Sequence, residues 1–277
     1  MALKDLLLHV DNSRAMAGRL AAAGELARVH GAHLSGVYVI RVPVLPSYAE
    51  AQIPSRIIEA QRAAFARAAS AAHSEFETAT TRLGISAEWR CVEGGLTDVL
   101  ALHAHYADLL VVGQADGSDP ECISQGLADR LALECGRPVM MIPASGAQAS
   151  IGRNVMVAWN AKREAVRAVG DAMPLLENAE RVTVVAINAS DCDPENAGIP
   201  AADIGLHLAR HGIEIQTKNL FGAPASIGEQ LLDAARDEAA DLLVMGAFGH
   251  SRFRELVLGG VTAHVVAKST IPVLLAH

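Results

Sequence analysis

Short, continuous apolar runs recur along the chain, separated by longer stretches in which apolar residues follow a helical period. Runs this short suit strands that are buried on both faces of a parallel sheet. The stretches between them place apolar side chains on one face of a helix that packs on such a sheet. The clearest runs are residues 109–112, 139–142, 242–245 and 273–276, and the clearest helical faces are Val166, Val169, Met173 and Leu176, and Ile227, Leu231 and Ala234.

The same pattern occurs twice, so the chain contains an internal repeat. Ala-Asp-Leu-Leu-Val-Val-Gly at residues 107–113 returns as Ala-Asp-Leu-Leu-Val-Met-Gly at residues 240–246. The starts of the two copies also match, with Asp11 opposite Asn160. The second copy is shorter between its first and third strands, and the difference falls in an Ala-rich helix around residues 61–76 of the first copy.

Each copy alternates strands and helices in the order β-α-β-α-β-α-β-α-β, which predicts a doubly wound parallel sheet with right-handed crossovers. The sequence therefore predicts an α/β protein of two doubly wound, five-stranded domains, residues 1–145 and 146–277. A small-residue linker near residues 143–147 would join them. The last strand of each copy, residues 138–142 and 272–276, is an apolar sheet edge that favours pairing.

Composition narrows the class of protein. The chain has 277 residues, of which 51% are hydrophobic and 19% charged, and its net charge is −8. A negative chain without a Lys/Arg run is a poor partner for nucleic acid. The apolar N-terminal stretch is broken by Lys4 and Asp5, and no segment is long enough to cross a bilayer. These features predict a cytoplasmic protein that does not contact membranes, and its four scattered cysteines suggest neither zinc nor a redox pair.

Glycines follow the fourth strand of the second copy, where doubly wound sheets bind ligands. Gly246, Gly249 and Gly259 have the spacing Gly-x2-Gly-x9-Gly, and Gly260 opens an apolar helical segment. Glycines allow close approach of the backbone, and a helix N-terminus offers free N–H groups to an anion. An ordinary loop and helix start would explain scattered glycines about equally well, but their place in a repeated βα frame favours a phosphate site.

This pattern resembles the universal stress protein family, which carries Gly-x2-Gly-x9-Gly-(Ser/Thr) at this place. Gly260 stands where the family has Ser or Thr, and Val261 and Thr262 follow as they commonly do. The resemblance covers both copies. It implies two adenine nucleotide alpha hydrolase-like domains that pack as an intramolecular pseudo-dimer through their last strands. It leaves open a homodimer of the whole chain.

The resemblance also implies ATP as the ligand, with or without Mg²⁺, bound in the second copy. The phosphates would lie on the glycines with the Ser251 and Thr262 hydroxyls nearby, and the adenine and ribose at the ends of the first two strands. Asn160 replaces the Asp that is common in the family. Trp159 fits base stacking and core packing equally well. The ATP-binding residues implied are Ala158, Trp159, Asn160, Ile187, Met245, Gly246, Gly249, His250, Ser251, Gly259, Gly260, Val261 and Thr262.

The first copy departs from this pattern. Asp116 stands in the place of the second glycine, Gly126 matches the third, and Asp129 falls opposite Thr262. Carboxylates around the expected phosphate position would repel ATP. We expect the first copy to be a degenerate partner domain.

Other site types are disfavoured. The chain lacks the P-loop, Rossmann and nucleophile-elbow motifs. His207 and His211 are spaced for metal binding on a helix, but no third ligand is apparent and surface histidines are the better interpretation. Two functional classes remain: an ATP-binding stress or regulatory protein with little turnover, and a slow ATPase or nucleotidyl transferase on the same fold. The lack of a Lys clamp or carboxylate pair for phosphoryl transfer favours binding, with no catalytic or metal-ligating residue predicted.

Overall fold

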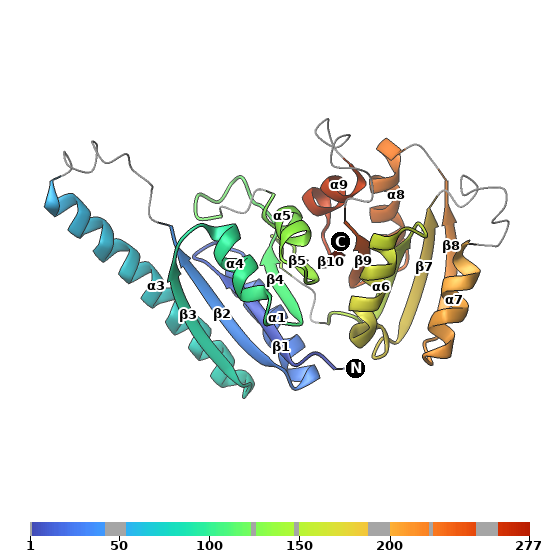
Figure 1. The fold of residues 1–277 in the computed structure, drawn as a ribbon, viewed down its shortest axis with the longest axis horizontal. Helices are drawn as coiled ribbons and strands as arrows, with labels where there is room; N and C mark the ends of the chain where they lie inside the picture. Colours follow the sequence, from blue (N-terminus) through green and yellow to red (C-terminus); the bar gives the residue numbers. More distant parts are fainter. Residues whose placement is uncertain are drawn as a thin grey trace.

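The computed structural model describes residues 2–41, 54–122, 126–146, 150–187, 200–221, 224–247 and 260–277. The described residues form two successive β/α halves (Figure 1). The first half comprises β1 (Asp5–Val10), α1 (Met16–His30), β2 (His33–Ile40), α3 (Ser55–Leu83), β3 (Ala87–Glu93), α4 (Leu96–Ala104), β4 (Leu109–Gly113), α5 (Leu127–Glu134) and β5 (Val139–Ile142). The second half comprises β6 (Asn154–Trp159), α6 (Arg163–Leu176), β7 (Arg181–Ile187), α7 (Pro200–Arg210), β8 (Ile215–Leu220), α8 (Pro224–Asp237), β9 (Leu242–Gly246), α9 (Val261–Lys268) and β10 (Val273–Ala276).

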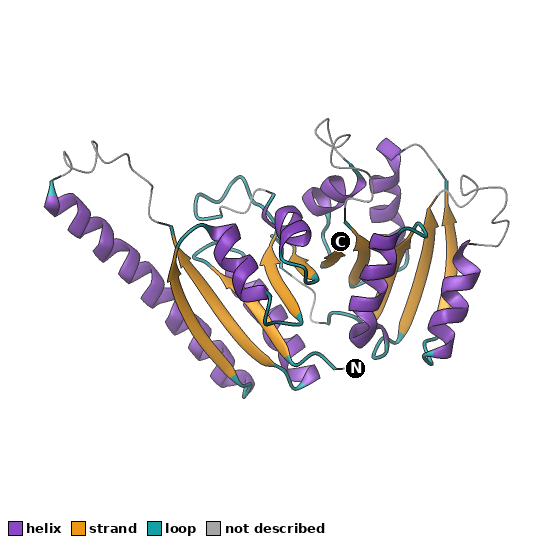
Figure 2. Ribbon diagram, viewed as in Figure 1, coloured by secondary structure: helices purple, strands orange, loops and turns teal. Residues whose placement is uncertain are grey.

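All ten strands belong to one sheet, in the order β3-β2-β1-β4-β5-β10-β9-β6-β7-β8. Strands pair in parallel within each half, and the strand order reverses between β1 and β4 and again between β6 and β9. This confirms the predicted doubly wound topology, because a chain that winds both ways from a central strand must produce such a switch. Figure 2 shows the strands of both halves with helices against them.

The last strands of the two halves meet at the centre of the sheet, as the sequence predicts. β5 and β10 are antiparallel, with Met141 opposite Val273, Met140 opposite Leu274 and Val139 opposite Leu275. All side chains of β5 and β10 are buried. Because this pairing occurs within the chain, these two edges are no longer open to a second copy.

Two hydrophobic cores lie on opposite faces of the sheet. One packs under α1, α3, α6 and α7, and the other under α4, α5, α8 and α9. Successive residues of a strand point to opposite faces, so Met140 joins the first core and Met141 the second. Both cores run across the junction between the halves.

The helical face predicted for α6 is partly wrong. Val166 is 56% exposed, whereas Val169 and Leu176 are buried and Met173 is partly buried. The buried face is rotated toward the alanines, because small side chains let the helix approach the sheet closely. It consists of Ala165, Ala168, Val169, Ala172, Leu175 and Leu176, with Glu164 at its start.

Helix α3 contains the extra length of the first half. It has 29 residues, and its buried side chains are Ala69, Ala72, Phe76 and Thr80. Its first half projects beyond the sheet in Figure 1. In the described part of the chain, no helix is long and apolar enough to span a membrane.

The aspartate of the repeated Ala-Asp-Leu-Leu-Val segment anchors the start of each half. Asp241 is 4% exposed and accepts hydrogen bonds from the backbone N–H groups of Gly152 (2.9 Å), Arg153 (3.1 Å) and Asn154 (3.1 Å). Its counterpart Asp108 accepts two, from Lys4 (2.7 Å) and Asp5 (3.1 Å). The repeat therefore conserves a structural contact at the edge opposite the candidate site.

We expect Asp241→Ala to lower the free energy of unfolding by about 3 kcal/mol, because it leaves three backbone donors without a charged acceptor. Asp108→Ala, at the less buried equivalent, should cost about 1 kcal/mol. Urea unfolding followed by circular dichroism measures both. Equal losses of unfolding free energy in the two variants would contradict the larger effect that we expect at the more buried aspartate.

Candidate functional site

The candidate site lies where β6, β7 and β9 end in the second half. β6 and β9 are neighbours, and Ala158 is directly opposite Met245 in their register. β7 lies on the other side of β6 and ends at Ile187. The strand topology therefore brings together Ala158, Trp159 and Asn160 with Met245 and Gly246, as predicted.

The two ends of the predicted glycine pattern differ in what the structure shows of them. Gly260 is the N-cap of α9, has no side-chain cap, and is followed by Val261 and the buried Thr262. The predicted site residues Gly249, His250, Ser251 and Gly259 lie outside the described residues. Of the predicted glycines, the structure therefore describes Gly246 at the end of β9 and Gly260 at the start of α9.

The first loop of the site is a turn stabilised by Asn160. Its Oδ1 accepts a hydrogen bond from the Lys162 N–H at 3.1 Å, and Ala161 between them has a positive φ of 56°. In the first half Asp11 makes the equivalent hydrogen bond, accepting from the Ser13 N–H at 3.0 Å, although Asn12 between them does not have a positive φ. This confirms that Asp11 and Asn160 are equivalent, and it shows that Asn can replace Asp in the turn.

Gly246 is needed for packing at this end of the sheet. A Cβ added to Gly246 would lie 2.6 Å from the carbonyl carbon of Glu164 and 2.6 Å from the nitrogen of Ala165. The close approach that the glycine allows is therefore to the first turn of α6, a protein contact that the sequence did not indicate.

Charged side chains that sequence reasoning missed surround Gly246. Glu164 pairs with Arg163 at 2.8 Å, and Arg163 also lies 3.4 Å from the His277 ring. Burial acts to raise the pKa of Glu164, but backbone hydrogen bonding and Arg163 outweigh it and keep the pKa below its usual value. The site thus combines one ionised, paired carboxylate with an exposed arginine. In the sequence, the cationic residues Lys162 and Arg163 just after the first strand of the second copy could have indicated these charges.

Trp159 is a core residue. It is 8% exposed and belongs to the core under α1, α3, α6 and α7. Of its two interpretations from sequence, core packing is the one the structure supports.

The backbone hydrogen bonds of α5 and α9 correct the alignment of the two copies by one residue. The N–H of Arg130 bonds to the Gly126 carbonyl, and that of His264 bonds to the Gly260 carbonyl, both at 3.1 Å. Gly126 therefore corresponds to Gly260, and Asp129 corresponds to Ala263 instead of Thr262. Asp129 still places a carboxyl in the first turn of α5, where its burial raises its pKa.

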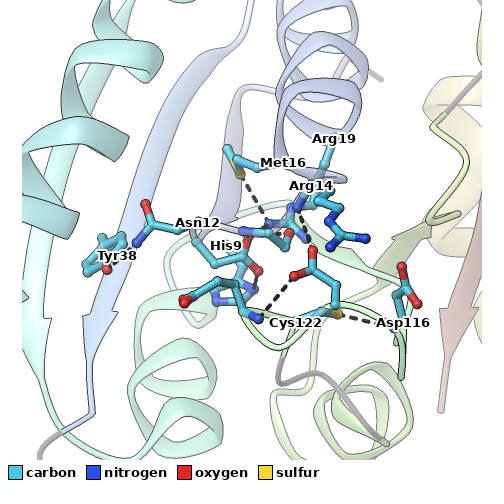
Figure 3. A network of polar contacts seen from close by, with 12 residues as sticks. His9, Asn12, Arg14, Met16, Arg19, Tyr38, Asp116 and Cys122 are labelled. Carbon is cyan, nitrogen blue, oxygen red and sulfur yellow. Dashed lines mark hydrogen bonds and ion pairs between the residues drawn. The ribbon is translucent and has the colours of Figure 1, made fainter.

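The equivalent edge of the first half is filled by its own side chains (Figure 3). Arg19 of α1 is 1% exposed and donates from Nη2 to Asp11 at 2.6 Å. A Cβ on Gly113, at the end of β4, would overlap its guanidinium. His9, at the end of β1, is 5% exposed and lies next to this pair, with its Nδ1 3.9 Å from Asp11.

Burial and charge fix the ionisation of this network. Burial and the neighbouring Arg19 lower the pKa of His9 to about 4. Burial acts to raise the pKa of Asp11, but Arg19, His9 and the hydrogen bonds from Ser13 outweigh it and hold the pKa below its ordinary value. At neutral pH the network therefore contains a neutral histidine and an ion pair.

One carboxylate of the loop after β4 turns inward. Asp119 is 5% exposed and accepts from the Arg14 N–H at 2.7 Å, while Asp116 accepts from the Ser118 hydroxyl in an exposed contact. The cavity that remains beside His9 has a volume of about 40 Å³. That is room for a few water molecules. The first half is closed by packing as well as by charge.

Sequence reasoning missed Arg19 and His9 because an arginine in an amphipathic helix and a histidine in a strand are unremarkable alone. The repeat contained the signal. With Asp11 aligned to Asn160, the counterparts of His9 and Arg19 in the second half are Ala158 and Ala168. Two alanines stand where the first half has two buried polar side chains.

Known proteins agree with this architecture. The model of the universal stress protein family matches residues 152–277, which contain the candidate site. The second half of the chain belongs to the universal stress protein family. The structure of a universal stress protein from Archaeoglobus fulgidus superposes over 98% of this chain and 95% of its own, with a TM-score of 0.75 and 18% identity. That likeness shows a shared fold along the whole length, in the tandem two-domain form.

Sequence similarity to individual universal stress proteins is confined to shorter segments. The universal stress protein Slr1230 of Synechocystis is 38% identical over 92 residues, which are 33% of this chain and 30% of that protein. The matched segments span less than half of the length of the curated relatives. A further universal stress protein, 23% identical over 45% of this chain with a TM-score of 0.35, was solved in complex with cAMP.

Within the described residues, no group of three or more His, Cys, Asp or Glu side chains is arranged to hold a metal ion. His207 and His211 contact each other edge-on, with ring centroids 5.0 Å apart, on α7.

Proposed function

We propose that the second half of the chain binds ATP, and that the protein has a regulatory or stress-response role with little or no turnover. The observation that carries this proposal is the contrast between the two halves. Ala158 and Ala168 stand where His9 and Arg19 place buried polar side chains in the first half, so the described strand ends of the second half contain no such network. Membership of a family with a nucleotide-bound relative supports the choice of ligand.

The residues present fit the triphosphate and the nucleoside. The first turn of α9 carries no acidic side chain and lies at the positive end of the helix dipole, which suits an anion at Gly260, Val261 and Thr262. The adenine and ribose would lie against the ends of β6 and β7, at Asn160 and Ile187. The full set of proposed ATP-binding residues is Ala158, Trp159 (through its backbone), Asn160, Ile187, Met245, Gly246, Gly249, His250, Ser251, Gly259, Gly260, Val261 and Thr262.

Little turnover is proposed because the described part of the site offers no assembled machinery for phosphoryl transfer. Glu164 is engaged by Arg163 instead of being free to hold Mg²⁺ or to activate water. Mg²⁺ would enter bound to the phosphates. We further propose that the two functional units divide at residues 145–146, with the first acting as a partner that does not bind ATP.

The test is isothermal titration calorimetry of the full chain with Mg-ATP. We expect a stoichiometry close to one ATP per chain, because the first half is filled. An overnight incubation analysed for ADP, AMP and pyrophosphate should show almost no product. Two equivalent sites per chain, or no binding at all, would overturn the assignment of the site, and rapid product formation would overturn the assignment of the role.

A further inference from the structure

The side chain of Gln114 connects the two halves at the junction between α5 and α9. Gln114 follows β4 directly and is 9% exposed. Its Nε2 donates to the carbonyl of Val266 at 2.8 Å and to that of Ser269 at 3.1 Å, both in the second half. Its Oε1 accepts from the Ala144 N–H at 3.0 Å. The amide thus ties the loop after β4, the segment after β5 and helix α9 together.

The two carbonyls that Gln114 reaches are at the C-terminal end of α9. α9 ends at Lys268, and Ser269 is its C-cap. The last four carbonyls of a helix have no intrahelical N–H partner, so a helix end depends on outside donors. For α9 a side chain of the other half provides such a donor.

This contact has no equivalent in the second half. The backbone N–H of Gln114 bonds to the Ile142 carbonyl and that of Ala247 bonds to the Ala276 carbonyl, both at 2.8 Å. Gln114 and Ala247 are therefore structural counterparts. Ala247 is fully buried and has no side-chain amide. The first half thus holds α9 through a side-chain amide, while the described residues of the second half make no such bond to α5.

We propose that Gln114 is a positioning residue for the ATP site of the second half, which it holds in place through α9. This inference rests on the function proposed above, because the start of α9 at Gly260 is the phosphate-facing end. α9 has eight residues, about 12 Å of helix, and a rigid helix fixed at one end has limited freedom at the other. The first half, closed to ATP itself, thereby contributes to ATP binding in its partner.

The test uses Gln114→Ala, which introduces the residue that occupies this place in the second half. Asp108→Ala is the matched control, because it removes two hydrogen bonds to backbone N–H groups at the opposite end of the same strand, far from α9. Gln114→Glu is a second variant: its carboxylate can accept from Ala144 but cannot donate to the two carbonyls. Amide hydrogen exchange of α9 without nucleotide, ATP affinity and urea unfolding are measured for each.

In Gln114→Ala and Gln114→Glu we expect amide exchange in residues 261–268 to rise about tenfold and the Kd for ATP to rise about fivefold, since each lost hydrogen bond is modest. Asp108→Ala should lower stability without changing either quantity. Unchanged α9 exchange in the Gln114 variants, or faster exchange with unchanged ATP affinity, would overturn the proposal, as would an equal loss of affinity in Asp108→Ala. If the unmodified protein does not bind ATP, the proposed function fails, and α9 exchange still shows whether Gln114 holds the helix.

Discussion

Arg19→Ala should lower the free energy of unfolding by about 3–5 kcal/mol, because it leaves the Asp11 carboxylate without its charged partner among buried groups. The Arg19–Asp11 contact is 2.6 Å long, with the arginine side chain 1% and the aspartate side chain 15% exposed. Removing one member of such a pair costs far more than the pair contributes relative to a neutral substitute. Urea unfolding at pH 7, followed by fluorescence and circular dichroism, measures the loss.

The second half of the chain supplies the control for this prediction. Its residues at the two positions are Asn160 and Ala168, a neutral pair. The double variant Asp11→Asn/Arg19→Ala should therefore recover about 2 kcal/mol of the loss, because Asn keeps the turn to Ser13 without a buried charge. The remaining deficit would reflect the cavity left by the arginine stem. A double variant less stable than Arg19→Ala would show that the charge of Asp11 is not the source of the cost.

Gly260→Asp is expected to weaken ATP binding at least roughly 30-fold, about 2 kcal/mol, while leaving the protein as stable as before or slightly more stable. Gly260 is the N-cap of α9 with φ −58° and ψ 162°, a conformation that Asp adopts readily, and Asp is a favourable N-cap. The substitution therefore strengthens the helix while placing a negative charge where the proposed site receives the phosphates. Calorimetry gives the affinity and thermal unfolding gives the stability.

Two variants separate charge from shape in that experiment. Gly260→Ser also caps the helix but is neutral, and should keep ATP affinity within about threefold of the parent, since the expected effect is electrostatic. Gly126→Asp makes the same substitution in the first half, where the glycine has a left-handed φ of 64°, so it should lower stability but leave ATP affinity unchanged. If Gly260→Asp binds ATP like the parent, the phosphates do not lie at the start of α9. If Gly126→Asp abolishes binding in a folded protein, the first half is not a silent partner.

The asymmetry between the halves suggests how a tandem protein divides its work. In both halves the residue after the first strand, Asp11 or Asn160, accepts a hydrogen bond from the backbone N–H two residues ahead. In the first half buried side chains occupy the strand ends, and Gln114 extends into the second half. On our proposal, the first half serves as a structural support and the second half binds the nucleotide.

The sequence by itself determined the repeat, the β/α order and the four buried strands. These follow from local pattern, because short continuous apolar runs in a repeated βα frame favour strands that are buried on both faces of a sheet. The pairing of the last strands came from the family resemblance together with the tendency of apolar edges to pair. The acidic residues of the first copy led to the prediction of a degenerate site, which stays a prediction. Family resemblance added the nucleotide hypothesis.

Only the tertiary structure decided how the side chains meet. Val166 looked like a core residue, but the alanines of α6 allow a closer approach and turn it outward. Gly246 approaches α6, Arg19 crosses to Gly113, and Gln114 reaches across to α9. Such contacts join segments far apart in the chain, and an Arg, Gln or Gly carries no local mark of the partner that packing will bring to it.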